Sequence, residues 1–206
     1  MKKISFLLIP LLLFSMIFTS CDREYDEEQV KTEARQLLEK SVAVNEIFYG
    51  VGIPYTENSQ LSSGNYKQAK EEYISSLGAS DIEGLKSLAR EVYTAELCEI
   101  IFNTTLESIR DSSGNIHIFS RYIERNTPQG KYILVYSFLE PLYENDVEYL
   151  YDTLSVIGAR GEYIHVKVDV KLTTFDGFSR TERGVEFILL EEDGGFRLDT
   201  PSFVKY

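Results

Sequence analysis

The sequence predicts an α+β domain in which N-terminal helices pack on a curved antiparallel sheet of about five to six strands. Two observations lead to this prediction. Apolar residues recur at three- and four-residue steps between residues 30 and 109, which is the period of amphipathic helices. After the turn sequence at residues 111–114 the period changes to two, which is the period of half-buried strands. Because the helices precede hairpin-linked strands, we expect them on one face of a twisted sheet.

The composition excludes several classes of protein. The 206 residues include 33 acidic and 21 basic side chains, for a net charge of −12. A nucleic-acid-binding protein needs a basic face, so we expect no nucleic acid as a partner. Two Cys and two His cannot build a zinc framework or a disulfide scaffold. With no glycine-rich phosphate loop, nucleophile elbow or calcium loop, the sequence predicts no metal and no cofactor.

Residues 1–20 have the layout of an export signal. Lys2 and Lys3 precede an apolar run over residues 4–18. This run is shorter than the 18 to 20 or so residues that a membrane-spanning helix needs, and it contains Pro10, which bends helices. A cleaved signal peptide is therefore favoured over a permanent membrane span.

The signal ends in Ile17-Phe18-Thr19-Ser20-Cys21, which resembles the lipobox of bacterial lipoproteins. The resemblance implies cleavage before Cys21 and attachment of diacylglycerol to its thiol. Phe18 stands where the family usually has Leu. Two acyl chains would hold the protein stably on the extracytoplasmic side of the cell membrane. The alternative is a plain secretory signal with an incidental cysteine.

Residues 21–28 are expected to form an acidic tether between the anchor and a single domain at residues 29–206. Residues 22–28 carry five carboxylates and one arginine, so they have little to bury and should stay extended. A role in sorting between membranes is the alternative. Without residues 1–20 the net charge is 19 minus 33, or −14, of which −10 lies in residues 29–206. Such a domain is not expected to lie flat on an anionic bilayer.

The helical half is divided by capping and breaking residues. Gly78 ends the second helix, Ser80 and Glu83 have the spacing of a capping box that starts the third, and Thr94 can cap the fourth. The four helices are expected at residues 30–48, 66–77, 82–92 and 95–109.

In the stranded half, residues 164–172 are the clearest strand. Five apolar residues alternate there with four polar ones, which is typical of a strand with one buried face. Turn sequences rich in Gly, Asn and Asp separate the other strands. These are expected at residues 115–125, 131–139, 147–157, 183–191 and 196–203.

Three segments of this half resemble the tail of NTF2-like (cystatin-like) domains of bacterial extracytoplasmic lipoproteins. They are residues 149–158, 164–172 and 185–203, the last containing Asp193-Gly194-Gly195-Phe196-Arg197-Leu198-Asp199-Thr200-Pro201. Phe196 replaces the family's usual Trp, and Thr200 replaces its usual Ser. The resemblance covers about 60 of the 206 residues. It implies a cone-shaped fold, and it leaves activity open because this superfold hosts isomerases, dehydratases, immunity factors and binding modules.

The resemblance also suggests where chemistry could lie. An isomerase-like site would place a carboxylate or histidine in an apolar cone, facing a tyrosine that donates to a developing oxyanion. His165 shares a strand face with Asp169, so the two could form part of a catalytic or binding row. The alternative is that this face is simply solvated, and the same two interpretations apply to His117. Cys98 is expected to be a buried, inert thiol. The candidate pocket or surface-site residues, whose pairing the spacing does not fix, are Tyr122, Tyr136, Asp152, Tyr163, His165 and Asp169.

Two functions from different classes follow. The first is a non-catalytic ligand-binding or protein-interaction module, attached to the membrane through Cys21, whose partner is a cell-envelope protein or a small ligand. The alternative is a small-molecule enzyme of the isomerase or dehydratase kind. It requires an apolar pocket between the first helix and the sheet that holds a carboxylate or histidine beside a tyrosine.

Overall fold

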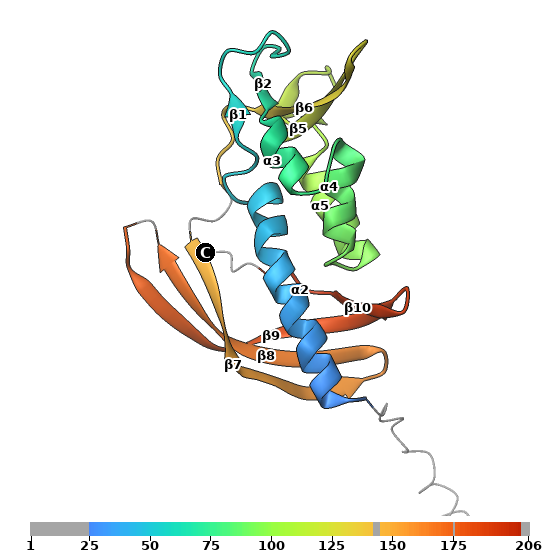
Figure 1. Ribbon diagram of the computed structural model, residues 1–206, viewed down its shortest axis with the longest axis vertical. Helices are drawn as coiled ribbons and strands as arrows, with labels where there is room; N and C mark the ends of the chain where they lie inside the picture. The colour runs from blue at the N-terminus through green and yellow to red at the C-terminus, as the bar shows by residue number, and fades with distance from the viewer. Residues whose placement is uncertain (1–24, 142–144, 175, 203–206) are drawn as a thin grey trace, which may run out of the picture.

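The computed structural model describes residues 25–141, 145–174 and 176–202, and over these residues the chain has an α+β fold. Helix α2 (Glu27–Phe48) runs from a lower sheet towards an upper sheet (Figure 1). Three shorter helices lie beside its C-terminal half, namely α3 (Glu71–Ser76), α4 (Ile82–Arg90) and α5 (Ala95–Thr105).

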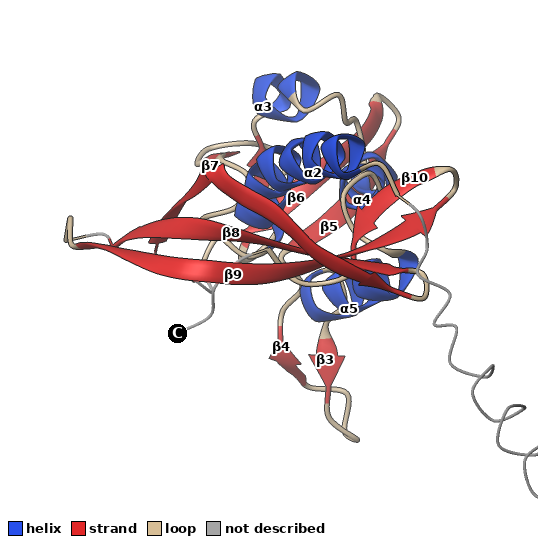
Figure 2. Ribbon diagram, turned by 90° about the horizontal axis from the view of Figure 1, so that it is seen from below, coloured by secondary structure: helices blue, strands red, loops and turns tan. Residues whose placement is uncertain are grey.

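The described strands form two antiparallel four-stranded sheets and one small hairpin, where the sequence predicted one sheet of five to six strands. The upper sheet has the order β1 (Tyr55–Thr56), β2 (Tyr66–Ala69), β6 (Gly130–Tyr136), β5 (Tyr122–Thr127). The lower sheet has the order β10 (Gly195–Leu198), β9 (Ser179–Glu192), β8 (Tyr163–Thr174), β7 (Asn145–Arg160). The hairpin of β3 (Ile109–Arg110) and β4 (Ile116–Ile118) projects from the body of the molecule (Figure 2).

Helix α2 begins at a side-chain cap. The carboxylate of Asp26 accepts hydrogen bonds from the backbone N–H groups of Glu28 (3.0 Å) and Gln29 (3.2 Å), which satisfies two of the free donors of the first turn. The helix therefore starts two residues before the predicted domain boundary at residue 29, and the end of the predicted tether belongs to it. One face of the helix is buried, as its period predicted. That face consists of Val30, Ala34, Leu37, Leu38, Ser41, Val44, Asn45, Ile47 and Phe48.

The shorter helices differ from the predictions in two places. Residues 66–69, predicted as helix, form β2, because they pair with β6 and the helix begins only after Lys70. The cap of α4 is Asp81 and not Ser80, since the Asp81 carboxylate accepts from the Gly84 N–H at 2.8 Å. The Thr94 cap of α5 is confirmed by its 3.4 Å hydrogen bond with the Leu97 N–H.

The predicted strand at residues 164–172 is confirmed by burial in β8. Its apolar residues are at most 1% exposed, whereas its polar residues face outward. The predicted strand at residues 115–125 is interrupted, because β4 and β5 belong to different pairings and Ser120 between them is buried. The predicted strand at residues 196–203 ends at Leu198, and the described chain continues as an irregular segment.

Both strands that flank β8 bulge beside Asp169. Four residues of β7, 151–154, lie opposite the single residue 168, and two residues of β9, 183–184, lie opposite Asp169. The Asp169 N–H donates to the Thr153 hydroxyl (2.8 Å), and its carboxylate accepts from the Gly184 N–H (2.8 Å). Because bulges bend strands and increase their twist, these contacts hold the curve of the lower sheet around α2 (Figure 1).

The C-terminal segment joins the lower sheet to the α4–α5 junction. Leu198 donates its N–H to the Val92 carbonyl (2.8 Å) and accepts from the Thr94 N–H (3.0 Å). The Thr94 hydroxyl in turn donates to the Asp199 carboxylate at 2.8 Å. Leu198 and Asp199 thus fasten the junction of α4 and α5 to the lower sheet.

Candidate functional site

Between the middle of α2 and the lower sheet, where the enzyme alternative requires a pocket, the space is filled with side chains. A cavity of about 250 Å³ lies farther along, between the start of α2 and the β9–β10 turn, and its lining includes Tyr25, Asp26 and Glu33. Leu38 and Ser41 of α2 are each 0% exposed, and the sheet presents a continuous apolar face to them. Each side chain of that face is at most 6% exposed, and together they are Tyr149, Ile164, Val166, Val168, Val170, Leu172, Phe187 and Leu189. This packing occupies the centre of the interior, and none of the predicted candidate residues lines the cavity at the start of α2.

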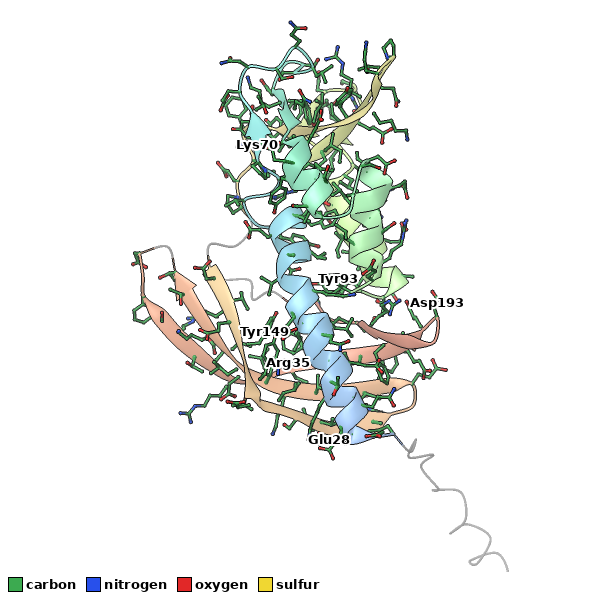
Figure 3. The ribbon with its side chains drawn as sticks, in the orientation of Figure 1. Glu28, Arg35, Lys70, Tyr93, Tyr149 and Asp193 are labelled. Carbon is green, nitrogen blue, oxygen red and sulfur yellow. The ribbon has the colours of Figure 1, made fainter. Side chains whose placement is uncertain are left out.

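A buried hydrogen-bond network lies at the edge of this core. The Tyr93 hydroxyl donates to the Asn45 side-chain carbonyl (2.7 Å) and lies 2.6 Å from the Ser202 hydroxyl. The Asn45 amide donates to the same hydroxyl at 2.8 Å, and Tyr149 donates to the Ser202 carbonyl at 2.5 Å. Burial raises the pKa of both tyrosines, which lie beside α2 (Figure 3). These four residues include no carboxylate or imidazole. Their hydrogen bonds fasten Ser202 of the C-terminal segment to α2 and β7.

Tyr122, a predicted candidate, is 0% exposed and joins the upper sheet to the end of α2. Its hydroxyl donates to the Ile47 carbonyl at 2.6 Å and accepts from the Ile53 N–H at 3.1 Å, and burial raises its pKa. Gly52 passes close by with a φ of +80°, and a Cβ there would lie 2.8 Å from the hydroxyl. Both hydrogen-bonding roles of Tyr122 are thus used by the backbone, and the residue acts as a structural anchor.

Four further candidates lie on the lower sheet and point outward. Asp152 is exposed within the β7 bulge, and Tyr163 is 43% exposed at the start of β8. His165 Nδ1 lies 2.5 Å from Glu186 Oε1, and Asp169 holds the two bulges. The structure brings none of these side chains against Tyr122 or Tyr136, which belong to the upper sheet. The side chain of His117 and the whole of Cys21 lie outside the described residues.

Cys98 is 1% exposed, and its thiol donates to the Tyr93 carbonyl at 3.6 Å. Burial raises the pKa of this thiol to about 11, so the reactive thiolate is suppressed at neutral pH. The prediction of a buried, inert cysteine is consistent with this environment.

Tyr136, the remaining candidate, lies at the centre of an aromatic cluster that we define as Tyr66, Phe119, Tyr136 and Phe138. Tyr66 and Tyr136 lie directly opposite each other in the β2–β6 pairing, so their rings share one face of the upper sheet. Tyr136 stacks on Phe119, with centroids 4.8 Å apart and planes at 9°. Tyr66 (5.5 Å) and Phe138 (5.9 Å) meet the Tyr136 ring at angles of 54° and 65°. Such stacked and tilted pairs are favourable beyond the area that they bury.

A hydrogen bond fixes the cluster at Tyr66, whereas Phe138 is exposed to solvent. The Tyr66 hydroxyl donates to the Ser120 carbonyl at 2.9 Å, which fixes the Tyr66 ring beside Tyr136. Phe138 is 67% exposed, and Ile118, next to Phe119 in the chain, is 51% exposed. Tyr66, Phe119 and Tyr136 are half-buried. An exposed aromatic side chain that packs on half-buried rings is a common feature of binding surfaces. The aromatic cluster is therefore the candidate functional site.

The cluster lies at the end of the molecule opposite to the start of α2. The 22 residues of α2 span about 33 Å, and the helix starts beside β10 and ends beside Tyr122 of the upper sheet (Figure 1). A ligand or partner on the cluster would thus be held well away from the point where the N-terminal segment joins the domain.

Sequence reasoning found one member of the cluster and missed three. Tyr66 was assigned to a helix, Phe119 falls between two strands, and Phe138 lies just after β6. The available signal was the alternation of Tyr136 with Phe138 at the end of a predicted strand, which places both rings on one side.

Other features of the described residues limit the possible chemistry. Within residues 25–141, 145–174 and 176–202, no three His, Cys, Asp or Glu side chains are grouped so that they could hold a metal ion. No helix in these ranges is long and apolar enough to cross a membrane. No protein-family model matches the chain, and a search of curated proteins finds no match. A functional assignment must therefore come from the geometry.

Proposed function

We propose that the protein is a lipid-anchored, extracytoplasmic binding module that contacts a cell-envelope protein or a small ligand through the aromatic cluster and has no catalytic role. The anchor part of this proposal is supported by the sequence of residues 17–21, in which Cys21 follows two small residues and an apolar pair. Two acyl chains on that cysteine would give a stable attachment.

The position of α2 relates this anchor to the binding surface. Six peptide units separate Cys21 from Glu27, so about 20 Å of extended chain at most lies between the acyl chains and the start of α2. The lower sheet would then be the end near the membrane. The upper sheet, with the aromatic cluster, would face away from the membrane, towards other components of the envelope.

The single observation that carries the binding assignment is that Phe138 is 67% exposed and packs against Tyr136, whose ring in turn contacts Tyr66 and Phe119. Large rigid aromatic side chains lose little conformational entropy on binding, and they dominate the energy of many interfaces. The enzyme alternative has less support, because the interior beside the middle of α2 is packed and its candidate residues lie apart.

We also propose that α2 and the lower sheet form an NTF2-like unit. A helix that lies along the concave side of a curved antiparallel sheet supports this proposal, as does the position of Asp199 and its neighbours at the end of the last strand. In this chain the interior of that unit is packed, so binding would fall to the upper sheet.

The test is capture from cell-envelope extract with matched variants of the mature protein. Phe138→Ala should reduce recovery of a specific partner or ligand about tenfold or more, since it removes the exposed aromatic side chain of the cluster. Phe178→Ala is the control, because Phe178 is 63% exposed on the turn between β8 and β9 of the other sheet. Equal recovery with the two variants, or repeated failure of the wild-type protein to capture anything, would contradict the proposal.

A further inference from the structure

A cavity that opens to solvent lies between α3 and the first residues of β6. Its lining comes from the end of β2, α3, the loop after α3 and residues 129–133. Its volume is about 250 Å³, which is the volume of about eight water molecules at roughly 30 Å³ each. None of the four residues of the aromatic cluster lines this cavity. It is therefore a separate place where a small ligand could bind.

One part of the lining is apolar and buried. It consists of core side chains that are each at most 7% exposed, namely Ala69, Ile74, Ala79 and Ile133. A polar group placed against these side chains would lose its hydrogen bonds to water and gain none in return. A ligand that fills the cavity should therefore present carbon–hydrogen groups on this side.

The rest of the lining is polar, and three of its residues have side chains with unused hydrogen-bonding capacity. Ser75, Ser80 and Gln129 are exposed, and none of their side chains forms a hydrogen bond with another described residue. A serine hydroxyl and a glutamine amide can each donate and accept. These side chains favour a ligand that also donates and accepts at several points.

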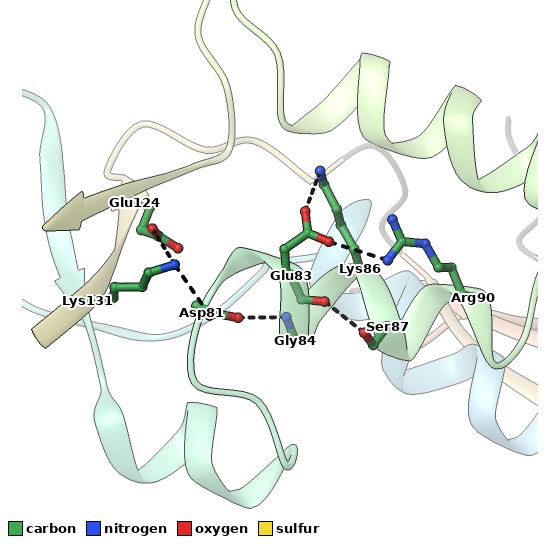
Figure 4. A network of polar contacts seen from close by, with 8 residues as sticks. All are labelled: Asp81, Glu83, Gly84, Lys86, Ser87, Arg90, Glu124 and Lys131. Carbon is green, nitrogen blue, oxygen red and sulfur yellow. Dashed lines mark hydrogen bonds and ion pairs between the residues drawn. The ribbon is translucent and has the colours of Figure 1, made fainter.

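The charges of the lining are balanced and already have partners. Among the described residues that line the cavity, only Glu71 and Lys131 are charged. Glu71 accepts a hydrogen bond from the Gln68 amide at 3.0 Å. The Lys131 ammonium lies 3.2 Å from the carboxylate of Glu124 and 3.8 Å from that of Asp81, as Figure 4 shows. A charged ligand would lose hydration without gaining an unpaired opposite charge, so a neutral ligand is favoured.

Hydrogen bonds hold the two walls of the cavity in place. The Ala79 N–H donates to the Ile74 carbonyl at 3.2 Å, which fixes the loop after α3. On the other wall, the Thr127 hydroxyl accepts from the Gln129 N–H at 3.1 Å and donates to the Gly130 carbonyl at 3.2 Å. Because the walls are preformed, binding of a ligand would need little ordering of the chain.

We propose that this cavity binds a neutral monosaccharide. A pyranose ring has carbon–hydrogen groups on its faces and hydroxyl groups around its edge that both donate and accept. The faces match the buried apolar side chains, and the hydroxyl groups match Ser75, Ser80 and Gln129. The site is separate from the aromatic cluster, so it stands whether or not that cluster is the principal binding surface.

The test uses the purified mature protein in micelles of a polyoxyethylene detergent, which contains no sugar. The probes are glucose, galactose, mannose and N-acetylglucosamine, each titrated by saturation-transfer NMR. At least one of them should bind saturably with a Kd of about 10 mM or lower. Glycerol, which has no ring, and glucuronate and glucosamine, which are charged, should each bind at least about tenfold more weakly, a difference of about 1.4 kcal/mol.

Two matched variants locate the site. Ser75→Phe places an aromatic ring in the cavity from an exposed position on α3, and it should weaken binding at least about tenfold. Ser76→Phe makes the same change at the next residue, which is exposed and does not line the cavity, so binding should be unchanged. Gln129→Ala, which removes one polar side chain, should weaken binding about two- to tenfold. Phe138→Ala should leave binding unchanged.

Four results would overturn the proposal. The first is no saturable binding of any of the four sugars at about 100 mM. The second is binding that survives Ser75→Phe or that Ser76→Phe weakens equally. The third is equally tight binding of glycerol, glucuronate or glucosamine, which would show that the cavity selects neither a ring nor a neutral ligand. The fourth is loss of binding in Phe138→Ala, which would place the sugar on the aromatic cluster.

Discussion

Replacing Asp169 by alanine should destabilise the lower sheet through its bulges. The variant loses the hydrogen bond from the Gly184 N–H to the carboxylate (2.8 Å) but keeps the one from its own N–H to Thr153. A hydrogen bond to a charged group contributes roughly 1.5–3 kcal/mol when it is buried. Asp169 is partly exposed and water can replace part of this bond, so we expect a loss of about 1 kcal/mol. For a domain of this size that corresponds to a fall in Tm of about 2–4 °C.

The assay is urea denaturation of the mature chain with Cys21→Ala, together with thermal melting. Asp169→Asn keeps an oxygen acceptor in the same place and should lose less than half as much stability as Asp169→Ala. Asp152→Ala, at an exposed position in the adjacent bulge, should stay within about 0.5 kcal/mol of wild type. If Asp169→Ala unfolds like wild type, or Asp169→Asn loses as much as Asp169→Ala, the assigned bulge contact is wrong.

Three further predictions concern the core, the tyrosines and the anchor. Tyr93→Phe should cost about 1–3 kcal/mol in denaturation experiments, because it leaves Asn45 and Ser202 with unmet hydrogen bonds in the core, and a loss no larger than that of Tyr163→Phe would contradict this. Burial raises the pKa of Tyr49 and Tyr151 to about 12, so the folded state holds these protons more tightly than the unfolded state does; stability should be intact below pH 10 and fall between about pH 10 and 12. Tyrosinate absorbance should show that Tyr49 and Tyr151 ionise at higher pH than the exposed tyrosines. If every tyrosine of the folded protein titrated near pH 10, this prediction would be wrong. Cys21→Ala should abolish incorporation of labelled fatty acid and release the protein from membranes, and unchanged labelling would refute the anchor.

The features that the sequence predicted well depend on residues close together in the chain. The period of α2 and the alternation in β8 are local, so both elements and their buried faces were predicted. The prediction that Ser80 caps α4 was wrong because Asp81, the next residue, caps it instead. Asp81 can cap the same helix, and Glu83, the expected partner of Ser80, pairs instead with Lys86 (2.9 Å) and Arg90 (3.4 Å).

The features that the sequence did not predict depend on pairing between strands that are far apart in the chain. Tyr66 lies 70 positions from Tyr136, and its spacing to Ala69 and Tyr73 also fits a helix, so the period favoured the wrong element. Because β2 was not predicted as a strand, nothing indicated that β5 and β6 belong to a second sheet. All predicted strands were therefore assigned to one sheet. The aromatic cluster requires this pairing, so Tyr136 could be proposed while Tyr66 could not.

The functions of the predicted polar candidates also needed the structure. Asp169 could be assigned to a strand face, but bulges depend on how three strands align. Tyr122 could be placed on a strand, but its hydroxyl bonds to the end of α2, 75 positions away, and this contact gives it a structural role.

The measurement that tests the central proposal most directly is site-specific photo-crosslinking of the full-length protein in cells that produce it. A photoreactive phenylalanine analogue would replace Phe138 in one strain and Phe178 in another, since both side chains are exposed to a similar extent on different sheets. A binding module that uses the aromatic cluster should give a discrete crosslinked product from position 138 and not from position 178. No product from position 138, or the same products from both positions, would contradict it.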